Sequence, residues 1–360
     1  MPTKLLRHLT AWCIALTVLQ GQAIQVRPAS TLTYPVSIVD GNSPSVWVDG
    51  LIHVYTSTGD HQMAMTGTDL FNLRESQSPV ITPKDHYPIW IESVWRDPDG
   101  AIYGWYHHEP GGVCPNGKLT APQIGAVVSD DGGSTFRDLG IVLSTGDRLN
   151  CGASNGFFAG GHGDFSVILD RDQHYFYFLF DNYSGPLQHQ GVSIARMRFE
   201  ERLSPVGAVN KYYAGTWDQP GIGGLVTPVF QADASWESSN TDALWGPSVH
   251  WNTHLKSYVA VLNRSCCKSG WPQEGIYISI SGDLSDPQSW SPPIKLMDDS
   301  AIGFAPGYYP QVVGIEAGGT DTLAGATARL FIKGISKWEI VFLTAEEAPP
   351  PVIPPEGPLE

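Results

Sequence analysis

Apolar and polar residues alternate over short stretches along most of the chain, and polar turns separate the stretches. Alternation of this kind is typical of β-strands that have one buried face. One unit of strand, polar turn and strand recurs five times. Its first strand and turn lie at 45–50, 93–100, 166–170, 248–252 and 311–314, followed by the apolar stretches LIHVYTS, AIYGWYH, YFYFLFD, SYVAVLN and ARLFIKG. The pattern predicts an all-β chain built from repeated hairpins.

The spacing of these units indicates how they are arranged. Their first positions are 48, 73, 82 and 63 residues apart. A solenoid needs a fixed period, whereas propeller blades of four antiparallel strands tolerate loop insertions. Signals for further outer strands follow at 65–70, 128–136 and 278–284. We therefore predict a five-bladed β-propeller, with residues 24–345 as a single domain.

Composition agrees with this fold class. The chain has 360 residues, of which 42% are hydrophobic, 39 are Gly and 28 are Pro. That much Gly and Pro interrupts helices every few turns, while the hydrophobic content is enough for a full core. Residues 346–360 are rich in proline and have no apolar period, so we expect a C-terminal tail outside the domain.

The N-terminus predicts a secretory leader at 1–23. Lys4 and Arg7 precede the apolar run 9–19, and the small residues Gly21 and Ala23 favour cleavage after Ala23. The run is shorter than the roughly 20 residues of a membrane-spanning helix. We expect a secreted or periplasmic protein with no membrane insertion after the leader is removed.

The net charge limits the partners that the protein can have. The formal charge is −15, and loss of Lys4 and Arg7 with the leader makes it −17. A field of this sign repels phosphate backbones and anionic membrane surfaces. We therefore expect no nucleic-acid partner and a neutral substrate.

Four cysteines remain after the leader: Cys114, Cys151, Cys266 and Cys267. An even number in an oxidising compartment predicts disulfides, and no C-x-x-C spacing of a metal site is present. Four cysteines allow three pairings. We favour Cys114–Cys151 together with a bond between the adjacent Cys266 and Cys267.

Candidate chemistry lies where the inner strands begin, because these positions converge on the propeller axis from distant parts of the chain. Three of the five entries supply a carboxylate: Asp40, Glu92 and Asp164. Two carboxylates beside an aromatic-lined cavity are what glycoside hydrolysis requires. We predict Asp40 as base or nucleophile, Glu92 as general acid, and Asp164 as the group that tunes pKa and orients substrate. The predicted substrate-binding residues are Trp90, Trp95, His162, Trp245, His250, Tyr308 and Tyr309.

With this repeat and these acids, the chain resembles the five-bladed β-propeller glycoside hydrolases, a family-43-like group of arabinanases, β-xylosidases, invertases and levansucrases. In that group an Asp at the first blade acts as base or nucleophile and a later Asp tunes pKa, and Asp40 and Asp164 match these positions. The group also has a Glu acid before Gly-Pro in the fourth blade, where this chain has Trp245. Glu92 and Asp242 are then the candidates for the acid, if the protein has one.

The resemblance also implies a carbohydrate substrate with arabinofuranose or xylose units and no required cofactor. It further implies that a structural or axial Ca²⁺ can bind near an axial histidine, although the sequence has no EF-hand loop.

Two alternatives follow from other features. Trp245 in place of the acid favours a carbohydrate-binding propeller without turnover. Residues 129–136 resemble the Asp-box turn of sialidases, through Ser129, Asp131, Gly133, Thr135 and Phe136. A sialidase-like enzyme needs three arginines at the axis, for which the candidates are Arg96, Arg148 and Arg264.

Overall fold

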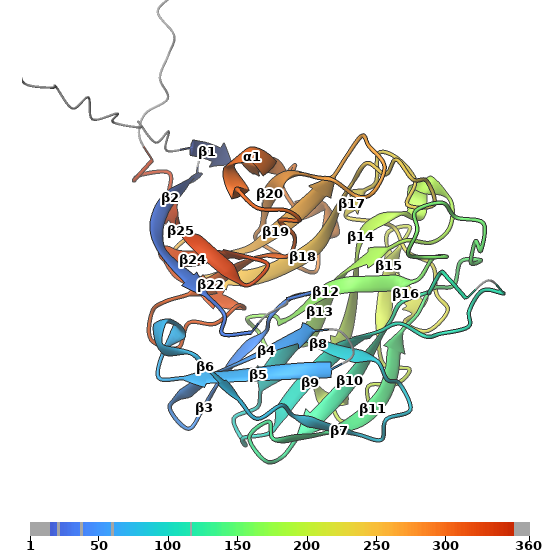
Figure 1. Ribbon diagram of the computed structural model, residues 1–360, viewed down its shortest axis with the longest axis horizontal. Coiled ribbons are helices and arrows are strands. Elements are labelled where there is room, and N and C mark those ends of the chain that lie inside the picture. The colour runs from blue at the N-terminus through green and yellow to red at the C-terminus, as the bar shows by residue number, and fades with distance from the viewer. Residues whose placement is uncertain (1–14, 20–21, 37–38, 59–60, 116, 349–360) are drawn as a thin grey trace, which may run out of the picture.

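Five antiparallel sheets follow one another around a ring in the computed structural model (Figure 1). The structure describes residues 15–19, 22–36, 39–58, 61–115 and 117–348, so most of the predicted leader and the tail from 349 onward lie outside the described residues. The predicted five-bladed β-propeller is confirmed. None of the described helices is long and apolar enough to cross a membrane.

Each repeat found in the sequence forms the inner hairpin of one blade. Blade 1 contains β3 (Ser45–Val48), β4 (Leu51–Thr58), β5 (His61–Gly67) and β6 (Arg74–Ser76). Blade 2 contains β8 (Ile89–Arg96), β9 (Ile102–His108), β10 (Gln123–Ser129) and β11 (Thr135–Leu143), with β7 (Val80–Thr82) parallel to β11. Blade 3 contains β12 (His162–Leu169), β13 (Tyr175–Asn182), β14 (Gly191–Arg198), β15 (Asn210–Tyr213) and β16 (Thr216–Pro220), and β17 (Phe230–Gln231) pairs with β14.

The last two blades complete the ring. Blade 4 contains β18 (Ala243–Asn252), β19 (Ser257–Ser265), β20 (Gln273–Ser281) and β21 (Ile294–Asp298), with β23 (Leu323–Ala324) parallel to β18. Blade 5 contains β22 (Pro310–Gly314), β24 (Thr327–Ile332), β25 (Ile335–Leu343), β2 (Gln22–Thr33) and β1 (Ala15–Leu19). The helical segments are short: η1 (Leu70–Asn72), η2 (Leu187–His189), η3 (Phe199–Glu201), η4 (Pro287–Ser289) and α1 (Asp299–Ile302).

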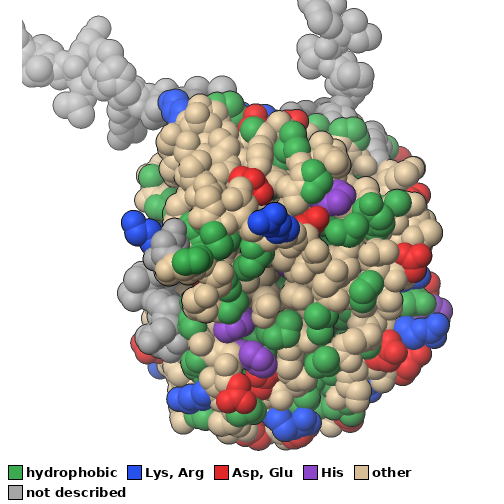
Figure 2. Space-filling view, turned by 90° about the vertical axis from the view of Figure 1, so that its right-hand side faces the viewer, with side chains coloured by type: hydrophobic (Ala, Val, Ile, Leu, Met, Phe, Trp, Pro, Cys, Tyr) green, Lys and Arg blue, Asp and Glu red, His purple; other side chains and the backbone are tan. Residues whose placement is uncertain are grey.

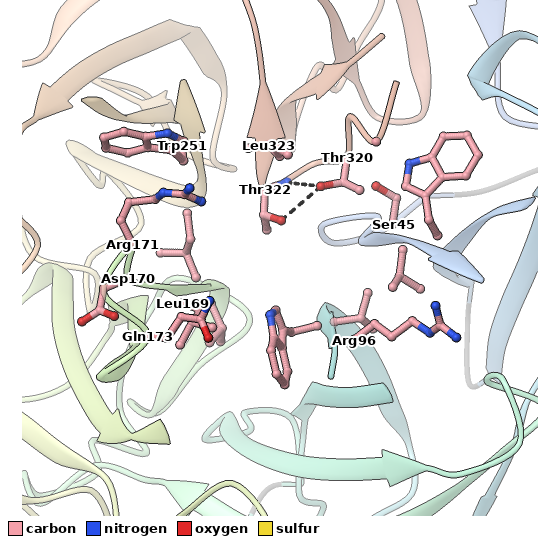
Figure 3. Close-up of a pocket in the computed structure, with 17 residues that line it drawn as sticks. Ser45, Arg96, Leu169, Asp170, Arg171, Gln173, Trp251, Thr320, Thr322 and Leu323 are labelled. Atoms are coloured by element: carbon pink, nitrogen blue, oxygen red, sulfur yellow. Dashed lines mark hydrogen bonds between the residues drawn. The ribbon is translucent and has the colours of Figure 1, made fainter. Parts of the chain in front are cut away.

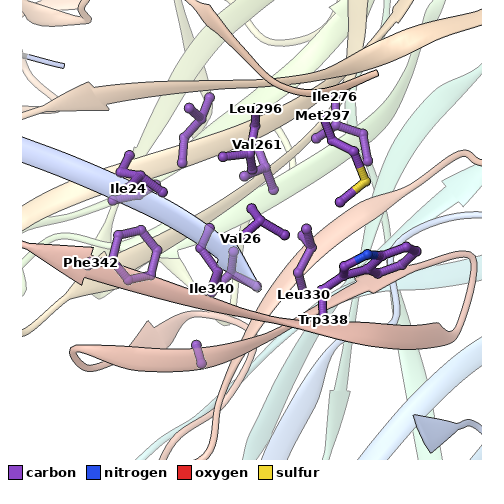
Figure 4. Packing of buried hydrophobic residues seen from close by; sticks show 14 of the residues in the cluster. Ile24, Val26, Val261, Ile276, Leu296, Met297, Leu330, Trp338, Ile340 and Phe342 are labelled. Atoms are coloured by element: carbon purple, nitrogen blue, oxygen red, sulfur yellow. The ribbon is translucent and has the colours of Figure 1, made fainter. Parts of the chain in front are cut away.

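The ring closes where the N-terminal strand β2 pairs with β25 near the C-terminus (Figure 1). Ile24 and Val26 of β2 are buried against blade 4 residues such as Val261 and Ile276 (Figure 4). This packing removes apolar side chains of both chain ends from water. Cleavage after Ala23, which stays a prediction, removes β1 and leaves Ile24 and Val26 in place.

Residues 40–43, which precede β3, connect blade 1 to the four other blades. The buried Asn42 side-chain amide donates to the Phe165 carbonyl at 2.7 Å and to the Pro247 carbonyl at 2.9 Å. The Ser43 N–H donates to the Gln311 side chain at 2.8 Å. Gly41 lies against blade 2, because a Cβ there would stand 2.8 Å from Glu92 Oε1. We refer to residues 40–43 as the hub loop.

The turn between β10 and β11 has the contacts expected of its sequence. Asp131 accepts the Thr135 N–H at 2.9 Å and the hydroxyls of Ser129 and Thr135 at 2.9 and 2.8 Å. Gly133 has φ of 89°, a conformation that favours glycine, and Phe136 is buried beneath the turn. Both carboxylate oxygens of this Asp are used within the turn, so its role is structural.

Both favoured disulfides are present, Cys114–Cys151 and Cys266–Cys267, which confirms the predicted pairing. On the face shown in Figure 2, basic and acidic side chains are interspersed among uncharged ones.

The hub loop generates a prediction about stability. Asn42→Ala should lower the free energy of unfolding by about 2–4 kcal/mol, because it removes the side-chain donor of two buried carbonyls. The exposed Asn210, whose amide donates to the Ala208 carbonyl, provides a matched control that should change stability by less than about 0.5 kcal/mol. Urea unfolding of both variants measures the difference, and equal effects would contradict the role given to Asn42.

Candidate active site

Asp40, Glu92 and Asp164 gather at one mouth of the propeller axis. Asp40 lies in the hub loop and is exposed, whereas Glu92 in β8 and Asp164 in β12 are 3% and 7% exposed. The negative charges of Glu92 and Asp40 both act on Asp164. Three blades therefore bring these carboxylates to one site, as the sequence predicts.

A β-bulge displays the site residue in each of three inner strands. Ile91 and Ser93 pair with consecutive residues of β9, so Glu92 is the extra residue of β8. Gly163 and Phe165 likewise pair with consecutive residues of β13, so Asp164 is extra in β12 and has φ of 38°. The third irregularity, in β18, lies between Trp245 and Ser248. Bulges redirect side chains and are common beside active sites.

Glu92 lies between a backbone donor and an imidazole. Its Oε2 accepts the Phe165 N–H at 3.1 Å, and its Oε1 is 3.5 Å from His107 Nδ1. His107 Nε2 is in turn 3.3 Å from Glu109 Oε1. Burial by itself lowers the pKa of His107, but the hydrogen bonds with Glu109 and Glu92 outweigh it and raise this pKa well above the usual value. The raised pKa favours the protonated form of the imidazole that lies between these two carboxylates.

Asp164 differs from Glu92 because the hydroxyl group that donates a hydrogen bond to it also lies close to a second carboxylate. The Tyr183 hydroxyl forms a short hydrogen bond to Asp164 and lies 3.4 Å from Asp181 Oδ2. Burial and then the charge of Glu92 raise the pKa of Asp164 to about 7. Asp164 therefore exchanges a proton near neutral pH.

Asp181 was not identified from the sequence, although it is fully buried at this site. Its Oδ2 accepts the Gly246 N–H at 2.8 Å, and burial followed by the charge of Asp164 raises its pKa well above the usual value. Asp181 lies near the end of β13, the strand paired antiparallel with β12, so it lies beside Gly163 at the same mouth. His107 lies near the end of β9, opposite Trp90, in the same way. A polar residue near the end of the second strand of a blade is therefore the sequence signal that would have identified both Asp181 and His107.

Four of the predicted aromatic residues gather around the carboxylates. Trp245 is 2% exposed, and its ring N–H donates to Ser265 Oγ at 2.9 Å. The centres of its ring and of the Tyr308 and Tyr309 rings are 4.9 and 5.7 Å apart. The Trp90 ring meets His107 edge-on at 5.6 Å. Burial and then the charge of Asp164 raise the pKa of Tyr309 well above the usual value. Trp245 thus fills the fourth-blade position that the resemblance assigns to an acid.

The side chains of Trp95, His162 and His250 do not face this site, so their predicted role in lining it was wrong. Trp95 is at the far end of β8, where its ring packs against Phe176 and lines a cavity at the other mouth of the axis. The two histidines are buried in the blades. His162 accepts a hydrogen bond from Lys211 Nζ at 2.9 Å, and His250 packs against Phe342.

The alternative acid, Asp242, and the three candidate arginines of a sialidase-like site have other contacts or lie elsewhere. Asp242 pairs with Arg264 at 2.9 Å, so neither is free for substrate. Arg96 lines the cavity at the opposite mouth. Arg96, Arg148 and Arg264 therefore do not form the triad that a sialidase-like site requires.

A smaller cavity of about 230 Å³ lies beside Glu109. Its walls are residues 109–112, 117–120 and 156–158, and the disulfide between Cys114 and Cys151 lies close to these loops in the sequence. Phe157 lines this cavity and is 54% exposed. An exposed ring face beside the acidic site is a surface on which the C–H face of a sugar can stack.

Glu92, His107 and Asp164 each offer an atom that can bind a metal, within 4.8 Å of one another. Ca²⁺ takes six to eight oxygen ligands. Two carboxylates and one imidazole do not supply that set, so the cluster fits acid–base chemistry better. The predicted axial Ca²⁺ stays a prediction.

Comparison with solved structures shows the same fold in glycoside hydrolases. A thermostable family-43 glycoside hydrolase matches with a TM-score of 0.52 and 12% identity over 91% of this chain and 100% of that chain. An exo-beta-1,3-galactanase from Phanerochaete chrysosporium matches with a TM-score of 0.50 and 13% identity, over 87% of this chain and 64% of that one.

A family-43 beta-1,3-galactosidase with galactodeoxynojirimycin matches with a TM-score of 0.50 and 12% identity, over 86% and 94% of the two chains. No family model matches the sequence, and no curated protein is similar to it in sequence. The predicted likeness to five-bladed propeller glycoside hydrolases is therefore confirmed at the level of the fold.

The raised pKa of Asp164 predicts how stability depends on pH. Between pH 4 and 7 the folded protein keeps a proton on Asp164 that the unfolded chain releases, so stability should fall as pH rises through this range. Asp164→Asn should make the free energy of unfolding fall less over this pH range, by an amount on the order of a few kcal/mol. Urea unfolding at pH 5 and 7.5 measures it. In the exposed Asp218→Asn control, the free energy of unfolding should depend on pH as it does in the unchanged protein. The same pH dependence in both variants would contradict the raised pKa of Asp164.

Proposed function

We propose that this protein is a glycoside hydrolase that cleaves a neutral polysaccharide or oligosaccharide. The observation that supports this most is the convergence of Asp40, Glu92 and Asp164 at one mouth, with the pKa of Asp164 raised to about 7. Glycoside hydrolysis needs one carboxyl group that keeps a proton and one that does not. The shared fold with family-43 glycoside hydrolases adds to the argument.

We assign the proton donor to Asp164 rather than to Glu92. Glu92 accepts the Phe165 N–H with one carboxylate oxygen and faces His107 with the other, so both oxygens already have partners within the protein. Its negative charge in turn helps to hold the proton on Asp164. Asp164 gives this proton to the leaving glycosidic oxygen, and Glu92 and Tyr183 act as positioning residues.

Asp40 is the base or nucleophile of this proposal. It is the exposed member of the group, so its carboxylate is accessible to water and to a sugar. The hub loop anchors it, because Gly41 and Asn42 are both packed against other blades. A carboxylate held in this way attacks the anomeric carbon or removes a proton from water.

The cavity beside Glu109 is the proposed substrate entrance. Phe157 offers a ring face there, and Glu109 leads through His107 to Glu92. Aromatic rings bind neutral sugars through their C–H faces and need no charge. This arrangement agrees with the neutral substrate expected from the net charge.

We place the protein in an extracytoplasmic compartment, secreted or periplasmic. The two disulfides support this, since such bonds form and persist in oxidising environments. The leader at 1–23 and the axial Ca²⁺ remain proposals.

A second candidate function is carbohydrate binding without turnover. The buried Trp245 favours it, because this ring fills a position where the resemblance expects a catalytic acid. Binding of an oligosaccharide with no release of reducing sugar would support this candidate and exclude the first.

The proposed roles predict the effect of two substitutions on hydrolysis. A panel of arabinans, xylans and galactans, assayed by release of reducing sugar, identifies the substrate. Asp40→Asn and Asp164→Asn should each lower kcat by about 10²–10⁴-fold, because each removes one proton-transfer or nucleophilic step. The exposed Asp218→Asn should retain full activity. If Asp164→Asn stayed active while Glu92→Gln did not, the donor would be Glu92.

The proposed entrance predicts a separate effect on binding. Phe157→Ala should raise KM by about 10-fold while kcat changes little, since it removes a stacking surface of about 1 kcal/mol or more and no reacting group. Phe71, which is 50% exposed on blade 1, provides the matched control. Equal KM values in Phe157→Ala and Phe71→Ala would place the entrance elsewhere.

A further inference from the structure

The mouth of the axis opposite the carboxylates contains a second cavity, of about 400 Å³. All five blades contribute to its wall, through residues at or beyond the far ends of their inner strands. It is lined by Trp47, Trp95, Arg96, Arg171, Gln173, Trp251, Thr320 and Thr322, among others. Its volume lies in the range of small-molecule sites. It shares no lining residue with the carboxylate site.

Aromatic side chains with fixed positions form part of this cavity. Trp47 donates its ring N–H to the Gly319 carbonyl at 2.9 Å. Trp95 is held edge-on between Phe176 and Phe199 at 5.4 and 5.5 Å. Rings that are already immobilised lose little entropy when a ligand stacks on them. Flat, rigid apolar surfaces beside hydroxyl groups are the surroundings that a sugar ring prefers.

Arg171 supplies a positive charge at the wall of this cavity. Its guanidinium lies 5.5 Å from the Trp251 ring centre, and Figure 3 shows it directed from below this ring toward the space between the blades. Among the described residues, Arg171 has no salt-bridge partner. A planar guanidinium with free donors is suited to bind a carboxylate through two hydrogen bonds.

The other charged groups at this mouth face elsewhere or are already used. Arg96 points outward in Figure 3 and is 3.7 Å from Asp49. Asp170 accepts the N–H groups of His174 and Tyr175 at 2.7 and 3.1 Å, and its carboxylate points away from the cavity centre in Figure 3. Of the three charged residues that line the cavity, Arg171 is therefore the one directed into it.

Hydroxyl groups complete the lining. Thr320 and Thr322 lie on the loop before β23, with their hydroxyl oxygens 3.1 Å apart, and the Thr322 hydroxyl faces the cavity centre in Figure 3. Each can exchange hydrogen bonds with the hydroxyls of a sugar ring. We propose that this cavity is a second, non-catalytic site that binds a carboxylated sugar, with its carboxylate on Arg171 and its ring against the tryptophans.

The test compares D-glucuronate with D-glucose, which differ only in the carboxylate, by calorimetry and tryptophan fluorescence at low salt. Glucuronate should bind at least about tenfold more tightly, since a charge-assisted pair adds this much. Arg171→Gln should weaken glucuronate binding about tenfold or more, and Arg171→Lys should weaken it less. Arg96→Gln, which removes the same charge from the same mouth, should change binding by less than about threefold.

Two further measurements distinguish this cavity from the carboxylate site and from a general anion site. Asp164→Asn should bind glucuronate as the unchanged protein does, so failure of the proposed hydrolysis leaves this result intact. Inorganic phosphate should compete poorly, and equal competition would show that the site recognises only an anion. Equal binding of glucose and glucuronate, or equal losses in Arg171→Gln and Arg96→Gln, would overturn the proposal. Thermal unfolding of each variant shows that the fold is retained.

Discussion

The Asn42 side chain is the contact on which the candidate site depends most. One amide group donates to carbonyls of blades 3 and 4, while its neighbours Gly41 and Ser43 reach blades 2 and 5. A ring of blades has no central core residue of its own, so this loop fixes the distance between blades at the mouth. The same loop carries Asp40, and the lack of a side chain at Gly41 leaves room for Glu92. Blade spacing and acid placement therefore have one physical origin.

The sequence predicts the fold well because its main signal is local. Alternation with a period of two, followed by a polar turn, identifies the inner hairpins, and their number indicates five blades. The favoured disulfide pairing, one of the three that four cysteines allow, is also the one present. Closure by β2 was not predicted, because its pairing with β25 joins residues about three hundred positions apart. Long-range pairing of this kind leaves no short-range pattern.

The site was predicted in part, and the errors have a common cause. Glu92 and Asp164 do lie at the same mouth, but the bulges in β8 and β12 that display them are not visible as a sequence pattern. His162 stands just before the bulge in β12 and faces Lys211 within the blade, although only two positions separate it from Asp164. Trp95 was assigned to the wrong mouth because an inner strand runs the length of the axis. Asp181 was missed because it lies near the end of a second strand and not at the start of an inner strand.

The position of Trp245 explains why the acids are concentrated on blade 3. At the irregularity of β18, between Trp245 and Ser248, the group that faces the acids is the backbone N–H of Gly246 and not a carboxylate. That donor binds Asp181, which shares the Tyr183 hydroxyl with Asp164. Two buried carboxyl groups that share one hydroxyl cannot both be ionised without a large cost, so one retains a proton. The backbone donor on blade 4 and the raised pKa of Asp164 on blade 3 are thus two aspects of one arrangement.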